Sequence, residues 1–234
     1  MESSSSLGHV ALDRLRRCLL ACAGLMVFAF GNYLQLQANI GMSPWFSLNQ
    51  GLALHFPITY GQASILCSIL FVCADLILRE SIGLGTILNA LVVGWGSDLF
   101  LALNVVPVQT RFPYQLAVLM LGIVIMCFGQ YFYMKAALSC GPRDAFLVAV
   151  GKRFPRRSIG TINLGILSAV QVLALALGGP FGVGTFIAIF CTGIIMDLIF
   201  KLLRFEPRSI EHEGLTQTYS ALRSAARAGS SLPH

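Results

Sequence analysis

Two aspartates at matching positions are the residues of this chain best suited to chemistry. Asp98 and Asp197 each end a pattern G-x-G-T-x7-G-x3-D, which begins at Gly83 and again at Gly182. Both lie in long apolar stretches, where inserting a carboxylate costs roughly 2.5–3.5 kcal/mol. A carboxylate kept at that cost can bind a proton or a cation and couple it to solute movement. The alternative is that both lie near helix ends and reach interfacial water or a neighbouring group.

The same pattern places a threonine at the start of each apolar stretch. Thr86 and Thr185 can cap the free amides of a helix start, and such a start is also a favourable place for an anion. The spacing fits either role. Four-residue steps lead from each threonine through a glycine to the aspartate, so these residues follow one side of a helix. The stripe predicts a closely packed neighbouring helix.

Amide side chains occupy a further pair of matching positions. Asn32 and Gln130 lie in the motifs Phe-Gly-Asn-Tyr and Phe-Gly-Gln-Tyr, each within an apolar stretch. Inside a helical bundle such amides either hydrogen-bond to a neighbouring helix or line a polar cavity. Both alternatives stay open at this point.

Two short segments with glycine and proline are the remaining candidates. Residues 44–55 and 142–152 are too short to cross a bilayer, and each opens on a proline that favours a first helical turn. Each is either a re-entrant half-helix whose N-terminus faces a solute, or a helix lying flat at the interface. In the first case, the residues expected to gate the two faces are Pro44, Trp45, Pro142, Arg143 and Asp144.

The elements that position these residues belong to a membrane protein. Hydrophobic residues make up 56% of the 234 residues and charged residues 11%, whereas a soluble domain has about 25% charged residues. This composition excludes a soluble enzyme, a disordered chain and a nucleic-acid-binding domain. Cysteines and histidines are scattered, with no C-x-x-C pair, so no metal or cofactor is expected. No nucleophile–base pair occurs either, and we expect no enzymatic activity.

Continuous apolar stretches predict an all-α, polytopic transmembrane bundle of about six spans. The predicted spans are 18–38, 60–78, 84–103, 115–138, 160–178 and 184–204. With the N-terminus inside, only Arg111 of the sixteen lysines and arginines falls outside, which follows the positive-inside rule. Both termini are therefore expected in the cytoplasm. Eight crossings, with both short segments crossing, are the alternative.

Arginines precede the first apolar stretch, as they do in a signal peptide. Only four residues separate Arg17 from Cys22, too few for the apolar core of a signal peptide. We therefore expect an uncleaved first span.

Motifs recur at a spacing of 98 or 99 residues. Phe30–Tyr33 and Phe128–Tyr131 are 98 residues apart, and the two glycine-threonine patterns are 99 apart. Each repeat holds three spans and one short segment. Because three is odd, the second repeat is expected to be inverted in the membrane. Inverted repeats with interrupted helices are typical of secondary transporters, whose sites lie near the repeat interface, although a duplication can also simply build a stable bundle.

The repeats define the expected organisation of the chain. A cytoplasmic N-terminal segment covers 1–17, the first membrane repeat 18–105 and the second 114–204. A largely disordered cytoplasmic tail is expected over 205–234.

Three motifs resemble those of a known family. They are Ile40-Gly41-Met42-Ser43-Pro44-Trp45, Cys140-Gly141-Pro142-Arg143-Asp144 and Gly178-Gly179-Pro180-Phe181-Gly182-Val183-Gly184-Thr185. Over about residues 18–205 the chain resembles the YczE/YitT-like bacterial integral membrane proteins. The resemblance implies a bacterial inner-membrane location and a multi-span fold, and supplies no settled activity. The chain has Phe46 and Gln171 where members of this family often have acidic residues.

Two hypotheses of function follow. The first is a small-solute permease or exporter, with Asp98 and Asp197 as ion or proton sites. The rival is a non-transporting accessory or scaffold protein, acting through a membrane-protein partner or as a homo-oligomer. The expected surroundings are the lipid bilayer, a small solute or ion and another membrane protein, with no nucleic acid.

Overall fold

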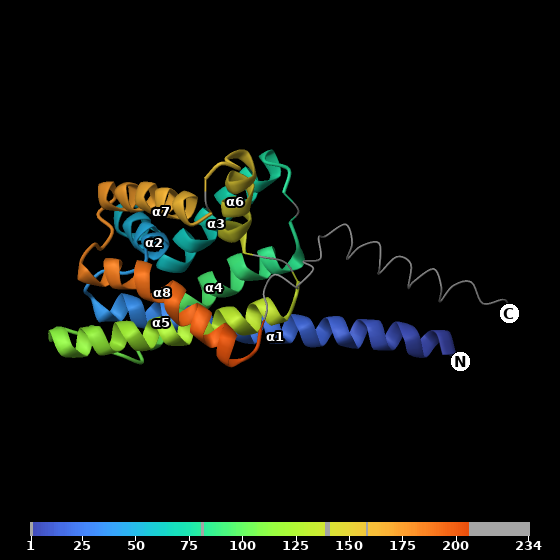
Figure 1. Cartoon of the computed structure of the whole chain (residues 1–234). Helices are drawn as coiled ribbons and strands as arrows, with labels where there is room; N and C mark the ends of the chain where they lie inside the picture. Colours follow the sequence, from blue (N-terminus) through green and yellow to red (C-terminus); the bar gives the residue numbers. More distant parts are fainter. Residues whose placement is uncertain (1, 81, 139–140, 158, 206–234) are drawn as a thin grey trace.

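The computed structural model describes residues 2–80, 82–138, 141–157 and 159–205 (Figure 1). These residues form eight α-helices and no β-strand, which confirms the predicted all-α bundle. In chain order the helices are α1 (Glu2–Ala38), α2 (Pro44–His55), α3 (Tyr60–Ile77), α4 (Leu84–Leu103), α5 (Phe112–Lys135), α6 (Pro142–Arg153), α7 (Ile159–Ala176) and α8 (Val183–Leu202). Residues 206–234 of the predicted tail lie outside the described residues.

Local sequence signals explain several helix ends. Pro44 and Pro142 begin α2 and α6 at a position where a missing amide hydrogen costs nothing. Thr59 caps α3, because its hydroxyl accepts a hydrogen bond from the amide of Gln62, whose side chain accepts one from the amide of Thr59. Asn104 ends α4 in the left-handed conformation, with φ at 45°.

Five of the six predicted spans are confirmed as helices long and apolar enough to cross a membrane. They are the 12–38 part of α1, and the whole of α3, α4, α5 and α8. The described apolar part of α7, residues 161–176, is shorter, so the sixth span stays a prediction. The short helices α2 and α6 have 12 residues each.

Helices α1 and α5 form the most extensive contact between two helices of the described residues. The two helices lie side by side and run in opposite directions (Figure 1). A Cβ atom added at Gly31 would lie 2.6 Å from the carbonyl oxygen of Gly122, and one added at Gly24 would lie 2.9 Å from that of Gly129. The glycines therefore let the two backbones touch, as small residues do between membrane helices.

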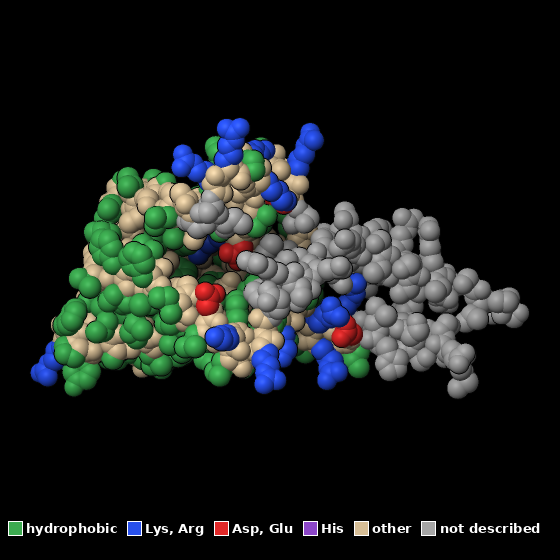
Figure 2. Space-filling model, in the orientation of Figure 1, with side chains coloured by type: hydrophobic (Ala, Val, Ile, Leu, Met, Phe, Trp, Pro, Cys, Tyr) green, Lys and Arg blue, Asp and Glu red, His purple; other side chains and the backbone are tan. Residues whose placement is uncertain are grey.

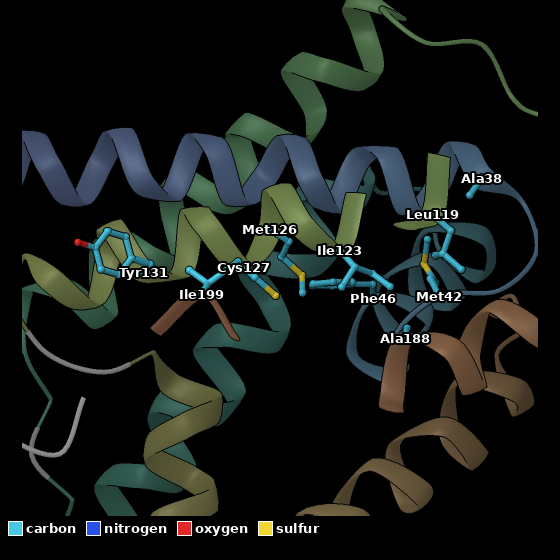
Figure 3. Close-up of a cluster of buried hydrophobic side chains, with 10 residues drawn as sticks. All are labelled: Ala38, Met42, Phe46, Leu119, Ile123, Met126, Cys127, Tyr131, Ala188 and Ile199. Carbon is cyan, nitrogen blue, oxygen red and sulfur yellow. The ribbon is translucent and has the colours of Figure 1, made fainter. Parts of the chain in front are cut away.

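Two of the remaining helices pack directly on this pair, and the other four pack mainly on one another. Helix α4 packs on α1 and α8 packs on α5, while α2 and α7 pack on each other and α3 packs on α2, α4 and α6. The main apolar cluster joins α5 to the end of α1, the start of α2 and α8 (Figure 3). Its buried members are Ala38, Met42, Phe46, Leu119, Ile123, Met126, Cys127, Tyr131, Ala188 and Ile199.

The outer surface is strongly apolar. Figure 2 shows hydrophobic side chains covering the part of the molecule that contains α7 and the starts of α5 and α8, with most lysines and arginines elsewhere. Exposed large hydrophobic residues of α7 and α8 include Leu164, Val172, Leu173, Phe186, Phe190, Ile194 and Leu198. A contiguous surface of this kind is the one expected to face lipid.

Candidate functional site

A cavity of about 350 Å³ lies between the starts of α2 and α6 and the facing sides of α7 and α8. Figure 2 shows the molecule hollowed between these last two helices, with basic and acidic side chains in the hollow. Cavities of ~300–1,000 Å³ are typical of small-molecule sites. The cavity is therefore large enough for a small solute.

The N-terminal ends of α2 and α6 meet at this cavity. Trp45 and Phe46 from the first turn of α2 line it, as do Arg143 and Asp144 from the first turn of α6. The guanidinium carbon of Arg143 lies 5.4 Å from the centre of the Trp45 ring and 5.7 Å from that of Phe46. Cation–π contacts thus join the two short helices.

Uncharged polar side chains complete the lining. Asn89, Gln130 and Asn163 face the cavity, and no hydrogen bond within the described part of the chain occupies their amides. Ser64 also lines the cavity and is 2% exposed, and the buried hydroxyl oxygen of Thr192 has no partner there. The cavity therefore offers hydrogen-bonding groups that no other described residue uses.

The structure brings together about half of the residues that the sequence analysis singled out. Those that line the cavity are Trp45, Gln130, Pro142, Arg143 and Asp144. Pro44 is buried beside them at the start of α2. Asn32, Thr86, Thr185, Asp98 and Asp197 are not among the lining residues.

Asp98 joins two helices. Its carboxylate accepts a hydrogen bond from the hydroxyl of Thr59 and another, at 2.7 Å, from the amide of Gly61. It thereby binds a free amide in the first turn of α3, where a negative charge is favourable. A Cβ atom added at Gly94 would lie 2.8 Å from the carbonyl oxygen of Gly61, so α3 and α4 are in backbone contact beside this carboxylate.

Asp197 has different surroundings, although it occupies the equivalent position on α8. Its side chain is exposed. A Cβ atom added at Gly193, which corresponds to Gly94, would meet nothing within 4 Å. Among the described residues, α7 and α8 do not pack along their lengths as α3 and α4 do. The second half is therefore open where the first half is closed.

The two threonines cap their helices. Each hydroxyl, of Thr86 and of Thr185, accepts a hydrogen bond of 3.4 Å from the glycine amide three residues earlier. The amide of Gly184 donates to the carbonyl of Ile40 at 2.7 Å, and the equivalent amide of α4 donates to Leu138 at 3.3 Å. Protein carbonyls thus occupy the amides that an anion would use at these helix starts.

Asn32 is buried between helices. Its side-chain oxygen accepts a hydrogen bond of 2.9 Å from the hydroxyl of Tyr60. Its side-chain nitrogen has no partner among the described residues. The equivalent amide, Gln130, instead faces the cavity.

Sequence reasoning missed several polar residues of the cavity, namely Ser64, Asn89, Asn163 and Thr192. The repeat contained a signal, because Ser64 and Asn163 are 99 residues apart and both are polar within apolar stretches. From the sequence, Asp75 is expected to form a local ion pair with Arg79, four residues later, and the structure shows no such pair. Asp75 is 1% exposed, and neither carboxylate oxygen has a hydrogen-bond partner in the described part of the chain.

A second, smaller cavity of about 210 Å³ lies near the α1–α2 and α7–α8 connections. Met42 and Gln35 line it, whereas Phe46 and Met126 line the larger cavity. Met42, Phe46 and Met126 belong to one apolar cluster and lie near one another in Figure 3. The side-chain nitrogen of Gln35 also contacts the sulfur of Met126 at 3.2 Å. Met42, Phe46 and Met126 therefore form an apolar plug between the two cavities.

Comparisons with known proteins agree with this picture of a membrane bundle. The chain is 31% identical over 192 residues to "Uncharacterized membrane protein YczE" of Bacillus subtilis, which covers 81% of this chain and 85% of that protein. It is 29% identical over 183 residues to an "Uncharacterized protein" of Haemophilus influenzae, covering 76% of this chain and 81% of that protein. It is 25% identical over 183 residues to "Uncharacterized protein YyaS" of Bacillus subtilis, covering 77% and 90%.

No solved structure matches this chain. Residues 15–201 match a family of unknown function, DUF6198. The chain therefore belongs to this family of YczE-like bacterial membrane proteins.

Proposed function

We propose that this protein is a small-solute permease or exporter of the bacterial inner membrane, with both termini in the cytoplasm and the larger cavity as its solute site. The observation that carries the proposal is that equivalent positions of the two halves line this cavity. Such pairs are Phe28 and Met126, Ser43 and Gly141, Trp45 and Arg143, Phe46 and Asp144, Ser64 and Asn163, and Val93 and Thr192. Transporters built from inverted repeats have their sites at this junction.

The packing of α1 on α5 supports an inverted repeat. Gly24 and Gly122 are equivalent positions, as are Gly31 and Gly129. Gly24 contacts Gly129, and Gly31 contacts Gly122. Exchanging the two halves therefore gives the same pair of contacts, as a twofold axis between two antiparallel helices requires.

The difference between the two halves supports a mechanism of alternating access. Helices α3 and α4 are closed on each other, whereas α7 and α8 are apart and the cavity opens between them. In the proposed second state, α7 closes on α8 while α3 leaves α4. The protein would then expose the same cavity on the other side of the membrane.

The two aspartates exchange roles in this scheme. Asp98 is now bound to the start of α3, and Asp197 is exposed. On closure of the second half, Asp197 binds the first turn of α7 and Asp98 is released. A released carboxylate can take up a proton or a cation, which would couple ion movement to the change of state.

Cross-linking between α7 and α8 tests the proposal. Ile65 contacts Gly94 in the closed half, and the equivalent positions in the open half are Leu164 and Gly193. In a variant whose native cysteines are replaced, we expect the pair L164C/G193C to form a disulfide in native membranes. A matched control pair, V172C/G193C, joins the same two helices at a different level and is expected not to react.

Failure of L164C/G193C to cross-link, in protein that retains its unfolding transition, would contradict alternating access. It would favour the rival function, a static accessory or scaffold protein whose α7 and α8 stay apart. Cross-linked protein in which an impermeant maleimide still labels N163C would also contradict the proposed closure of the cavity.

A further inference from the structure

The larger cavity contains a cation, Arg143, whose acidic neighbour Asp144 acts on it electrostatically but lies outside ion-pair distance. Arg143 lines the cavity, and its guanidinium group packs on Trp45 and Phe46. It forms no ion pair with any carboxylate in the described part of the chain. Charges inside proteins are normally paired, because burial without a partner is costly. An arginine held this way is suited to bind a planar or tetrahedral anion by paired hydrogen bonds.

Two helix dipoles add to this charge. Both 12-residue helices, α2 and α6, begin at the cavity, and each helix N-terminus carries a partial positive charge. In discontinuous transporter helices, such ends bind the anionic group of a substrate. The hydroxyl of Ser64, which is almost fully buried and has no partner in the described part of the chain, supplies a further donor at the same cavity.

The other polar groups of the lining suit a small organic anion. Asp144 is the acidic residue among those that line the cavity, and it is exposed. The amides of Asn89, Gln130 and Asn163 suit the polar part of an organic solute rather than an acyl chain. A volume of about 350 Å³ also limits the ligand to a small molecule.

We propose that the solute is a small organic anion, bound through a carboxylate or phosphate group by Arg143 and the converging starts of α2 and α6. The inference rests on the proposed function, because it assigns the ligand of the same cavity. Arg143 is the anchor of the anion, and the amides recognise the rest of the molecule.

Thermal unfolding of the full-length protein in detergent tests the proposal. The probes are sodium succinate and sodium phosphate, with choline chloride and glycerol as cationic and neutral controls at matched ionic strength. We expect one of the two anions to raise the unfolding midpoint, which identifies carboxylate or phosphate as the bound group. The variant R143Q is expected to bind that probe roughly ten- to hundredfold more weakly.

The matched control is D144N, which removes the neighbouring negative charge and keeps the side-chain shape. It is expected to retain the shift or increase it. If R143Q does not fold, R143K serves instead, because it keeps the charge but not the paired donors, and is expected to weaken binding partially.

Each other outcome overturns the inference. An anion-dependent shift that R143Q retains would remove Arg143 as the anchor. A shift with choline or glycerol alone would contradict an anionic solute and leave the permease function standing. No shift with either anion would also overturn the inference, while the cross-linking of α7 to α8 decides separately on the permease function.

Discussion

Equivalent residues of the two halves have different surroundings, and the aspartates illustrate this best. Asp98 accepts hydrogen bonds from Thr59 and Gly61, whereas Asp197 is exposed. The sequence predicted both positions, because a carboxylate in an apolar stretch is conspicuous. It could not predict the partners of Asp98, which lie at the start of another helix and depend on how closely α3 and α4 pack.

Replacing each aspartate separately distinguishes these surroundings. We expect D98N to lower the free energy of unfolding by about 1–2 kcal/mol, since it weakens two hydrogen bonds to a charged acceptor. The same change at the exposed position, D197N, is expected to lower it by less than about 0.5 kcal/mol. Denaturant unfolding in detergent measures both. Equal losses would show that Asp98 contributes no more than its equivalent.

At the scale of the elements, several helix boundaries were predictable but the closest contacts between helices were not. Prolines predicted the starts of α2 and α6, and apolar stretches predicted five of the spans, because these signals are local. The start of α1 at Glu2 was not predicted, and α5 covers Phe112–Lys135 where the sequence predicted 115–138. The backbone contact between α1 and α5 depends on glycines of two separate helices. Which glycines lie in this contact can be seen only in the folded structure. The starts of α2 and α6 meet at one cavity because separate helices pack together, and sequence patterns could not predict this meeting.

Two glycine substitutions test the α1–α5 contact. A Cβ atom at Gly31 would collide with the backbone of α5, so G31A is expected to destabilise the protein by roughly 1–3 kcal/mol. Gly165 on α7 has nothing within 4 Å of an added Cβ atom. There the same change is expected to be neutral or stabilising by up to about 1 kcal/mol, because alanine favours a helix. Similar midpoints of thermal unfolding for the two variants would argue against tight packing at Gly31.

At the scale of the whole molecule, two cavities lie on either side of one apolar plug. The larger is lined by Phe46 and Met126, and the smaller by Met42. The sequence predicted a membrane bundle with a repeat, and hence the region where a site should lie. The size of each cavity and the plug between them depend on how side chains from different helices pack together, such as Met42, Phe46 and Met126, and no sequence motif encodes this packing.

Removing a large side chain from the apolar plug is expected to connect the two cavities. We expect F46A to increase the leak of small anions from proteoliposomes, because Phe46 is 3% exposed and lies between the two spaces. The control is F186A, which removes a phenylalanine of α8 that is 54% exposed. An F46A leak no greater than that of F186A would show that the plug does not limit passage.

The reciprocal glycine contact between α1 and α5 has a consequence for how such a molecule can be assembled. Gly24 contacts Gly129, which is the equivalent of Gly31. Gly31 contacts Gly122, which is the equivalent of Gly24. An interface of this kind is isologous, as in a symmetric dimer. A chain of half this length, carrying a single copy of both glycines, would therefore present both sides of this contact, so that two antiparallel copies could form the same pair of glycine contacts. Fusing the two copies frees each half to diverge, as Trp45 and Arg143 have done at one shared position.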